Sequence, residues 1–117
     1  MNLAKPDMVG HNGNMESGKK AAETVDICLK ELQRAVDKVG SNTLITADHG
    51  NLEKMVDIST GTPFTQHTTN PVGVILYGND MKPVSLRNGS ALCDISPTLL
   101  KMMNVKQPSE MTGIALY

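Results

Sequence analysis

Residues 43–51 read TLITADHGN, and this stretch decides the fold class. Its first five residues are rich in β-branched side chains, which is typical of a short strand. The strand pattern stops at Asp48 and His49, so an acid and an imidazole follow the strand's carboxyl end. Residues 72–77 (VGVILY) predict a second buried strand, with a turn at 78–80. Because ligand-binding groups of α/β sheets gather at such strand ends, the stretch also predicts a functional site.

One helix is predicted before the first strand in the sequence and another after the second. Residues 17–39 have apolar side chains at steps of three and four, the period of one helical face, and Gly40 supplies the stop. The members of this apolar face are Ala21, Val25, Cys28, Leu32, Val36 and Val39. A last helix is predicted with Ser96 as N-cap and Pro97 as its first residue, ending near Asn104. This order, with nearly continuous apolar strands, predicts an α/β fold whose parallel strands are covered on both faces.

Two long segments show no regular period. Residues 1–17 are dense in Gly, Asn, Pro and Met, and Pro6 and Gly10 argue against a helix there. Residues 52–70 predict a second loop, with one helical turn near 52–56. Loops of this length in compact domains are often functional, so both are candidates for carrying a site.

Composition restricts the possible partners. The 117 residues suffice for one domain, and 11 basic against 12 acidic residues give a net charge of −1, which predicts no nucleic-acid partner. The sequence shows no bilayer-length apolar run and no secretory signal, so we expect a soluble, cytoplasmic protein without membrane contact. Cys28 and Cys93 have no C-x-x-C partner, which argues against a disulfide or zinc–cysteine framework. We expect both to be buried or half-buried thiols.

The three histidines all fall in polar loops, each near a carboxylate or a Thr-rich turn. The candidate metal ligands are Asp7, His11, Asp48, His49 and His67. Imidazole and carboxylate donors without cysteine favour Mn²⁺, Zn²⁺ or Fe over Mg²⁺ or Ca²⁺. Two such ions about 3.5–4 Å apart can clamp the oxygens of a phosphoryl transfer. Acid–base catalysis by a His–Asp pair is the competing interpretation, but no G-x-S-x-G nucleophile signature accompanies it.

Three segments resemble motifs of the 2,3-bisphosphoglycerate-independent (cofactor-independent) phosphoglycerate mutases of the alkaline phosphatase superfamily. They are NLAKPDMVGH at 2–11, LITADHGN at 44–51 and HTTNPV at 67–72. DISPTLL at 94–100 and EMTG at 110–113 resemble the closing segments of the same family. The resemblance therefore runs from end to end and in the family's order. It implies a partial alkaline-phosphatase-like three-layer sandwich, the C-terminal portion of the phosphatase domain.

The resemblance also implies roles for the ligands. Asp7, His11 and His67 would bind one metal, usually Mn²⁺, and Asp48 and His49 would bind the other. In this family of glycolytic isomerases a serine takes the phosphate from 3-phosphoglycerate and returns it to the neighbouring hydroxyl, which gives 2-phosphoglycerate. The family's substrate-clamping domain, its serine and an early aspartate ligand all precede the segments matched here.

The sequence departs from the family in lacking these parts. No serine of this chain has the family's Gly-Asn-Ser-Glu setting, so we expect no catalytic nucleophile and an incomplete second metal site. We therefore expect residues 1–117 to be a single partial metalloenzyme (phosphatase) domain, with the upstream strands and the substrate-clamping domain absent. Such a domain would be inactive alone and would engage phosphoglycerate only together with the upstream portion.

Two alternatives stay open. In place of a mutase part, the chain would be a non-catalytic, self-associating module with vestigial metal ligands, or part of another phosphatase or phosphopentomutase of the superfamily. In every case two strands make a sheet with unpaired edges, which predicts a homodimer through an exposed sheet edge.

Overall fold

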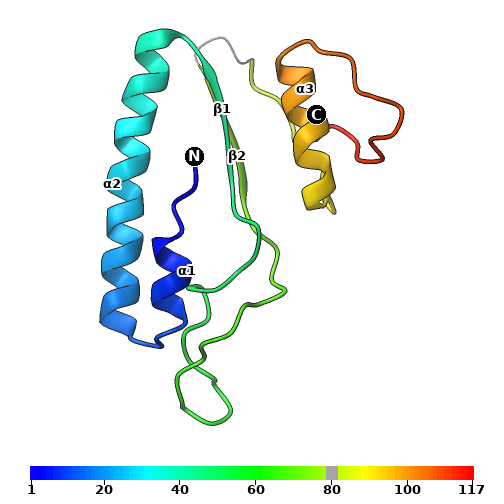
Figure 1. Cartoon of the computed structure of the whole chain (residues 1–117). Helices are drawn as coiled ribbons and strands as arrows, with labels where there is room; N and C mark the ends of the chain where they lie inside the picture. The colour runs from blue at the N-terminus through cyan, green and yellow to red at the C-terminus, as the bar shows by residue number, and fades with distance from the viewer. Residues whose placement is uncertain (79–81) are drawn as a thin grey trace.

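The computed structural model describes residues 1–78 and 82–117 of the chain. The elements, in chain order, are α1 (Lys5–Gly10), α2 (Met15–Val39), β1 (Asn42–Thr46), β2 (Val74–Gly78), the 3-10 helix η1 (Leu92–Asp94) and α3 (Ile95–Met102). Figure 1 shows α1 and α2 on one side of the paired strands and α3 on the other. The turn predicted at 78–80 lies largely outside the described residues. The mixed helix and strand composition agrees with the predicted α/β class.

Helix α2 confirms the predicted amphipathic helix and begins two residues before its predicted start, at Met15. The Asn14 side chain caps it by accepting a hydrogen bond from the Ser17 N–H at 2.9 Å, and Gly40 ends it in the left-handed conformation at φ 62°. Ala21 and Val36 of the predicted apolar face are buried. The predicted helix was therefore placed correctly, including its glycine stop.

The loop after β1 packs on the first turns of α2. Gly18 is buried there, and a Cβ at this position would lie 2.5 Å from Sδ of Met55, which is itself buried. The glycine therefore lets the loop approach the helix closely. Instead of the predicted helical turn near 52–56, residues 52 and 53 form a turn, with the Lys54 N–H donating to the Asn51 carbonyl at 3.1 Å, and Val56 pairs with Pro63 in an isolated bridge.

The two strands pair antiparallel, with Asn42 opposite Gly78 and Thr46 opposite Val74. The prediction of parallel strands was wrong. A parallel pair needs a crossover connection, usually a helix, whereas the long helix here precedes β1 and an irregular loop joins β1 to β2. As a result the chain leaves β1 and enters β2 at the same end of the sheet, which brings residues 48–51 and 67–70 into one region.

The predicted start of the last helix was also wrong. The 3-10 helix η1 leads directly into α3, so Ser96 is not the N-cap and Pro97 lies in the first turn, where its missing N–H is tolerated. Thr98 is fully buried: its hydroxyl donates to the Asp94 carbonyl at 2.6 Å and accepts from the Leu116 N–H at 3.0 Å. These bonds tie the end of the chain to α3.

The chain exposes more surface than a compact domain of its size. Its accessible surface is 8360 Å², against about 6,200 Å² expected from its mass. The radius of gyration is 16.6 Å, where about 13 Å is expected for this length. The strand residues are half-buried or exposed, and Ile75 is 56% exposed, so the strands are not covered on both faces as predicted. Apolar surface is therefore open for contact with further polypeptide.

Both cysteines are free. Cys28 is half-buried as expected, whereas Cys93 is exposed, contrary to the prediction. Within residues 1–78 and 82–117, no helix combines the length and the apolar character that crossing a membrane requires.

Candidate metal centre

Helix α1 places two of the predicted ligands one turn apart. Pro6 lies in the first turn of this helix, where no intrahelical partner awaits its absent N–H. The His11 N–H donates to the Asp7 carbonyl at 3.2 Å, so the two residues have the i,i+4 spacing of a helix. The expectation that Pro6 and Gly10 exclude a helix was therefore wrong, because both residues are compatible with the ends of a short one. Both ligand side chains leave the same face of α1.

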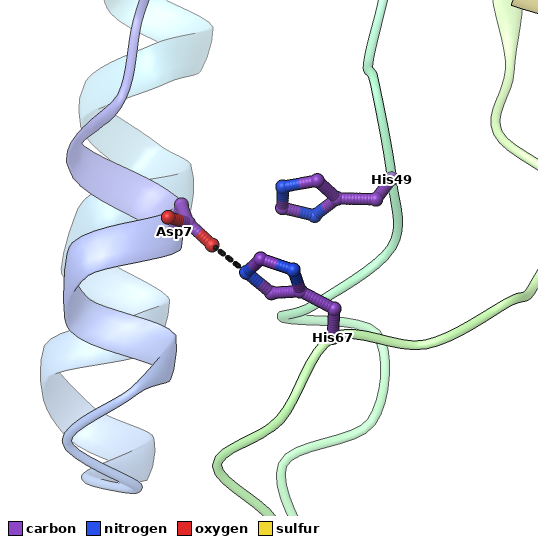
Figure 2. Close-up of side chains that lie close together, drawn as sticks. All are labelled: Asp7, His49 and His67. Carbon is purple, nitrogen blue, oxygen red and sulfur yellow. Dashed lines mark hydrogen bonds and ion pairs between the residues drawn. The ribbon is translucent and has the colours of Figure 1, made fainter.

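Two further predicted ligands, His49 and His67, come from the two loops at the end of the sheet. The Thr68 N–H donates to the Gly50 carbonyl at 2.9 Å, which pairs the loop after β1 with the loop before β2. This pairing stacks the rings of His49 and His67, whose centroids are 3.6 Å apart at an interplanar angle of 18°. Figure 2 shows both rings next to Asp7 of α1, with His67 pointing at its carboxylate.

Asp7, His11 and His67 converge on one point. Nε2 of His67 is 3.0 Å from Oδ1 of Asp7 and 3.1 Å from Nε2 of His11. Nε2 of His11 is in turn 3.4 Å from the same Asp7 oxygen. Ligand atoms bound at about 2.0–2.2 Å to one ion lie about 3.0–3.5 Å from each other, so the three atoms have the separations of a metal's ligands.

The protonation pattern of His11 supports the same conclusion. Nδ1 of His11 lies 2.7 Å from the Thr65 carbonyl, which can only accept, so Nδ1 carries the hydrogen. In the neutral ring Nε2 is then a bare acceptor, and it faces a carboxylate oxygen and a second imidazole nitrogen. A single proton on Nε2 of His67 can be donated to Asp7 or to His11, but not fully to both. A divalent cation would instead pair with the Asp7 oxygen and both Nε2 atoms. A backbone carbonyl on the outer ring nitrogen is also the usual support of a metal-binding histidine.

The Asp7 carboxylate is held in its ionised form. The Asn51 side-chain amide donates to Oδ1 of Asp7 at 2.7 Å. This hydrogen bond, with smaller help from the nearby imidazoles and against partial burial, lowers the pKa of Asp7 below its usual value. The side chain is 39% exposed and those of His11 and His67 are 45% and 46% exposed, so an ion can enter from solvent.

The two remaining predicted ligands, His49 and Asp48, lie in different surroundings. His49 joins the group: a ring nitrogen of His49, a carboxylate oxygen of Asp7 and a ring nitrogen of His67 all lie within 4.8 Å of one another. Asp48 lies at the rim with an 83% exposed side chain, and its Oδ2 is 3.7 Å from Nε2 of His49. The structure thus brings together Asp7, His11, His49 and His67, and leaves Asp48 beside them and facing solvent. The division of these ligands between two ions stays a prediction.

Several residues that support the site were not singled out from the sequence. Glu53 accepts hydrogen bonds from the Thr68 hydroxyl and, at 3.0 Å, from the Asn70 amide, and thereby joins the two ligand loops. The Thr68 bond is the main reason that the pKa of Glu53 is lowered. A Cβ at Gly50 would lie 2.2 Å from Oγ1 of Thr68, so only glycine permits this approach. Their position inside or directly after the 44–51 and 67–72 motifs was the signal that could have found them.

Comparison with known proteins fits this geometry. Residues 1–107 match the profile described as the metalloenzyme superfamily, and the chain belongs to that superfamily, whose fold is of the alkaline-phosphatase-like α/β type. Over 116 residues it is 53% identical to the 2,3-bisphosphoglycerate-independent phosphoglycerate mutase of Clostridium botulinum (strain Langeland), which covers 99% of this chain and 22% of that protein. The enzyme of the same name from Anaplasma phagocytophilum is 50% identical over 116 residues, covering 99% and 23%.

A solved structure of a phosphoglycerate mutase also matches this chain. A crystal structure of Leishmania mexicana phosphoglycerate mutase, described as determined at low cobalt concentration, superimposes with a TM-score of 0.86 at 30% identity. It covers 99% of this chain and 24% of the Leishmania chain. The predicted family resemblance and fold class are confirmed. The chain spans under a quarter of the length of these relatives.

Proposed function

We propose that this chain supplies the metal-binding part of a 2,3-bisphosphoglycerate-independent phosphoglycerate mutase, which interconverts 3-phosphoglycerate and 2-phosphoglycerate in glycolysis. The observation that carries the proposal is the convergence of Asp7, His11 and His67, whose ligand atoms are 3.0–3.4 Å apart. Identity of about half over 99% of the chain to enzymes of that name supports the substrate.

In this proposal Asp7, His11 and His67 hold one divalent ion, and Asp48 and His49 contribute to a second, with Mn²⁺ as the metal. When bound, such ions neutralise charge on a phosphoryl group and favour the ionised form of an attacking hydroxyl. Other residues of the chain fix the tautomer of His11 and the position of His67. The Thr65 carbonyl keeps the lone pair of His11 on Nε2, and the Gly50–Thr68 pairing holds His67 against Asp7.

The nucleophilic serine of the proposed reaction lies outside this chain. None of its serines has the Gly-Asn-Ser-Glu setting of the family. The serine in the loop between the strands makes another contact, since the Ser59 hydroxyl donates to Asp57 at 2.6 Å. We therefore propose that the chain has no mutase turnover by itself and that the serine and the substrate-binding groups come from the portion that the relatives have in addition.

A chimera tests this function. This chain replaces the matching segment of the Clostridium botulinum mutase, and conversion of 3-phosphoglycerate to 2-phosphoglycerate is assayed with Mn²⁺. We expect the chimera to be active, its Asp7→Ala and His67→Ala variants to be inactive, and the chain alone to show no turnover. A folded chimera that binds Mn²⁺ without turnover would contradict the assigned reaction, and turnover by the chain alone would contradict the external nucleophile.

The open surface favours a second property, self-association. We propose that the chain alone forms a homodimer through an exposed edge of the β1–β2 sheet, because the surface exceeds that of a compact domain by about a third. Sedimentation velocity over a hundredfold range of concentration is the test. A species of dimer mass that depends on concentration is expected, and a monomer at every concentration would contradict it.

A further inference from the structure

One side chain that holds Asp7 in place is not among the predicted metal ligands. Asn51 is only 7% exposed, one of few buried polar side chains in residues 1–78 and 82–117. Its Nδ2 is 2.7 Å from Oδ1 of Asp7 and 3.4 Å from the Asp7 carbonyl oxygen. The amide thus spans the loop after β1 and helix α1, two segments that supply different ligands of the proposed site.

The chemistry of this contact suits a metal ligand. Helix α1 has six residues, and the Asp7 side chain is partly exposed, so contacts from other segments contribute to the orientation of its carboxylate. A neutral amide donor restricts the rotation of the carboxylate and leaves its negative charge in place for a cation. A lysine or arginine at the same position would neutralise that charge.

Gly10 provides the space in which Asn51 fits. A Cβ at Gly10 would lie 1.8 Å from Oδ1 of Asn51 and 2.5 Å from its Cγ, and Gly10 is buried. Because Gly10 lies in α1 at an ordinary helical φ, the conformation does not require glycine; the close approach of the amide does. The sequence pair of Gly10 and Asn51 is thus explained by a single contact between two distant segments.

We propose that Asn51, seated against Gly10, is a positioning residue that orients the Asp7 carboxylate toward a divalent cation. This inference rests on the metal site of the proposed function and adds a role for a residue that does not itself bind the ion. The expected effect of losing such a supporting hydrogen bond is a fall in metal affinity of about 10–100-fold.

The test measures Co²⁺ affinity of the full chain by its visible absorption, with circular dichroism to confirm that each variant is folded. Asn51→Leu removes the donor at similar size, and Gly10→Ala displaces the amide without changing it. Both are expected to weaken Co²⁺ binding by about tenfold or more. Gly73→Ala is the matched control, because a Cβ there meets nothing within 4 Å, and it should bind like wild type.

A double-mutant cycle separates positioning from a general structural role. In an Asp7→Ala background Asn51→Leu should change the affinity by less than about twofold, because the carboxylate that it orients is gone. Equal losses in both backgrounds, or no loss in wild type, would overturn the inference. If Asp7→Ala itself leaves Co²⁺ affinity unchanged, the metal site of the proposed function is wrong. If Asp7→Ala weakens Co²⁺ binding and Asn51→Leu does not, only the role of Asn51 is refuted.

Discussion

Asp7 and Asp94 organise opposite ends of this chain, and the protein satisfies them to different degrees. Asp94 is buried at 7% exposure, and its oxygens accept from the Ile114 N–H at 2.8 Å, the Ala91 N–H at 3.0 Å and Arg87 at 3.3 Å. These donors close the C-terminal segment around α3. The carboxylate is paired within the protein and acts as a structural anchor.

Asp7, in contrast, is partly exposed and lies beside two imidazole rings. It accepts one amide hydrogen bond from Asn51, and the same oxygen lies near the ring nitrogens of His11 and His67. The comparison indicates how a structural carboxylate differs from the proposed ligand: the first is saturated by fixed donors, and the second is oriented by one amide donor and leaves an oxygen facing two imidazole nitrogens. Substitutions at the two ends should therefore separate stability from metal binding.

The largest effect on stability is expected at the C-terminal end. Leu116 is 2% exposed, and Leu116→Ala should lower the free energy of unfolding by about 3 kcal/mol through lost burial and a cavity. Urea denaturation of the metal-free chain measures this change. Co²⁺ affinity should stay within about twofold of wild type in the folded variant, since the sites are independent. A large loss of affinity would show that the two ends are coupled.

Metal binding should give the next largest effect. Mn²⁺ at a hundred times its dissociation constant should stabilise the chain by about 2.7 kcal/mol, seen as a rise in the melting temperature. Asp7→Ala and His67→Ala should lose this rise, while Asp26→Ala on the exposed side of α2 should retain it. If the ligand variants respond to Mn²⁺ as wild type does, the ligand assignment is wrong.

A smaller effect is expected at Thr98, whose hydroxyl joins α3 to the last residues. Thr98→Val removes the acceptor of the buried Leu116 N–H and should cost about 1–3 kcal/mol. Thr98→Ser keeps the hydroxyl and is the matched control, so it should lose less stability than the valine variant. The reverse order in denaturant unfolding would show that the methyl group, and not the hydrogen bond, matters there.

The smallest effect concerns acid stability. Hydrogen bonds from the Ile114 and Ala91 N–H groups lower the pKa of Asp94, with Arg87 assisting. Its stabilising contribution is therefore complete above the unfolded-state pKa near 3.8 and is lost as the pH falls through the lower folded-state value. Asp94→Asn should melt below wild type at pH 6, and the difference should shrink toward pH 2. A difference that does not vary with pH would contradict this role.

The sequence predicted well those features that depend on local pattern. The period of 17–39 and Gly40 located α2, and the β-branched run located β1, because these signals act over a few residues. The sequence also singled out residues that the structure brings together, because imidazoles and carboxylates are donor types that divalent metals use, whereas their role as ligands stays a prediction. The motifs alone led to the family that comparison confirmed.

Features that depend on distant contacts were missed. Pro6 was interpreted as a helix breaker, although in the first turn of α1 it is compatible with the helix. The direction of strand pairing depends on the path of the long connection and not on the strands themselves. The role of Asn51 depends on its contact with Gly10 and Asp7, which are more than forty positions away in the chain. No local pattern encodes such a contact.

The most direct test of the central claim is anomalous X-ray diffraction from crystals of the chain soaked in Mn²⁺. The account predicts an anomalous peak about 2.0–2.2 Å from Oδ1 of Asp7 and from Nε2 of both His11 and His67. A well-diffracting soaked crystal with no peak between these three atoms, or with peaks only at other side chains, would contradict it.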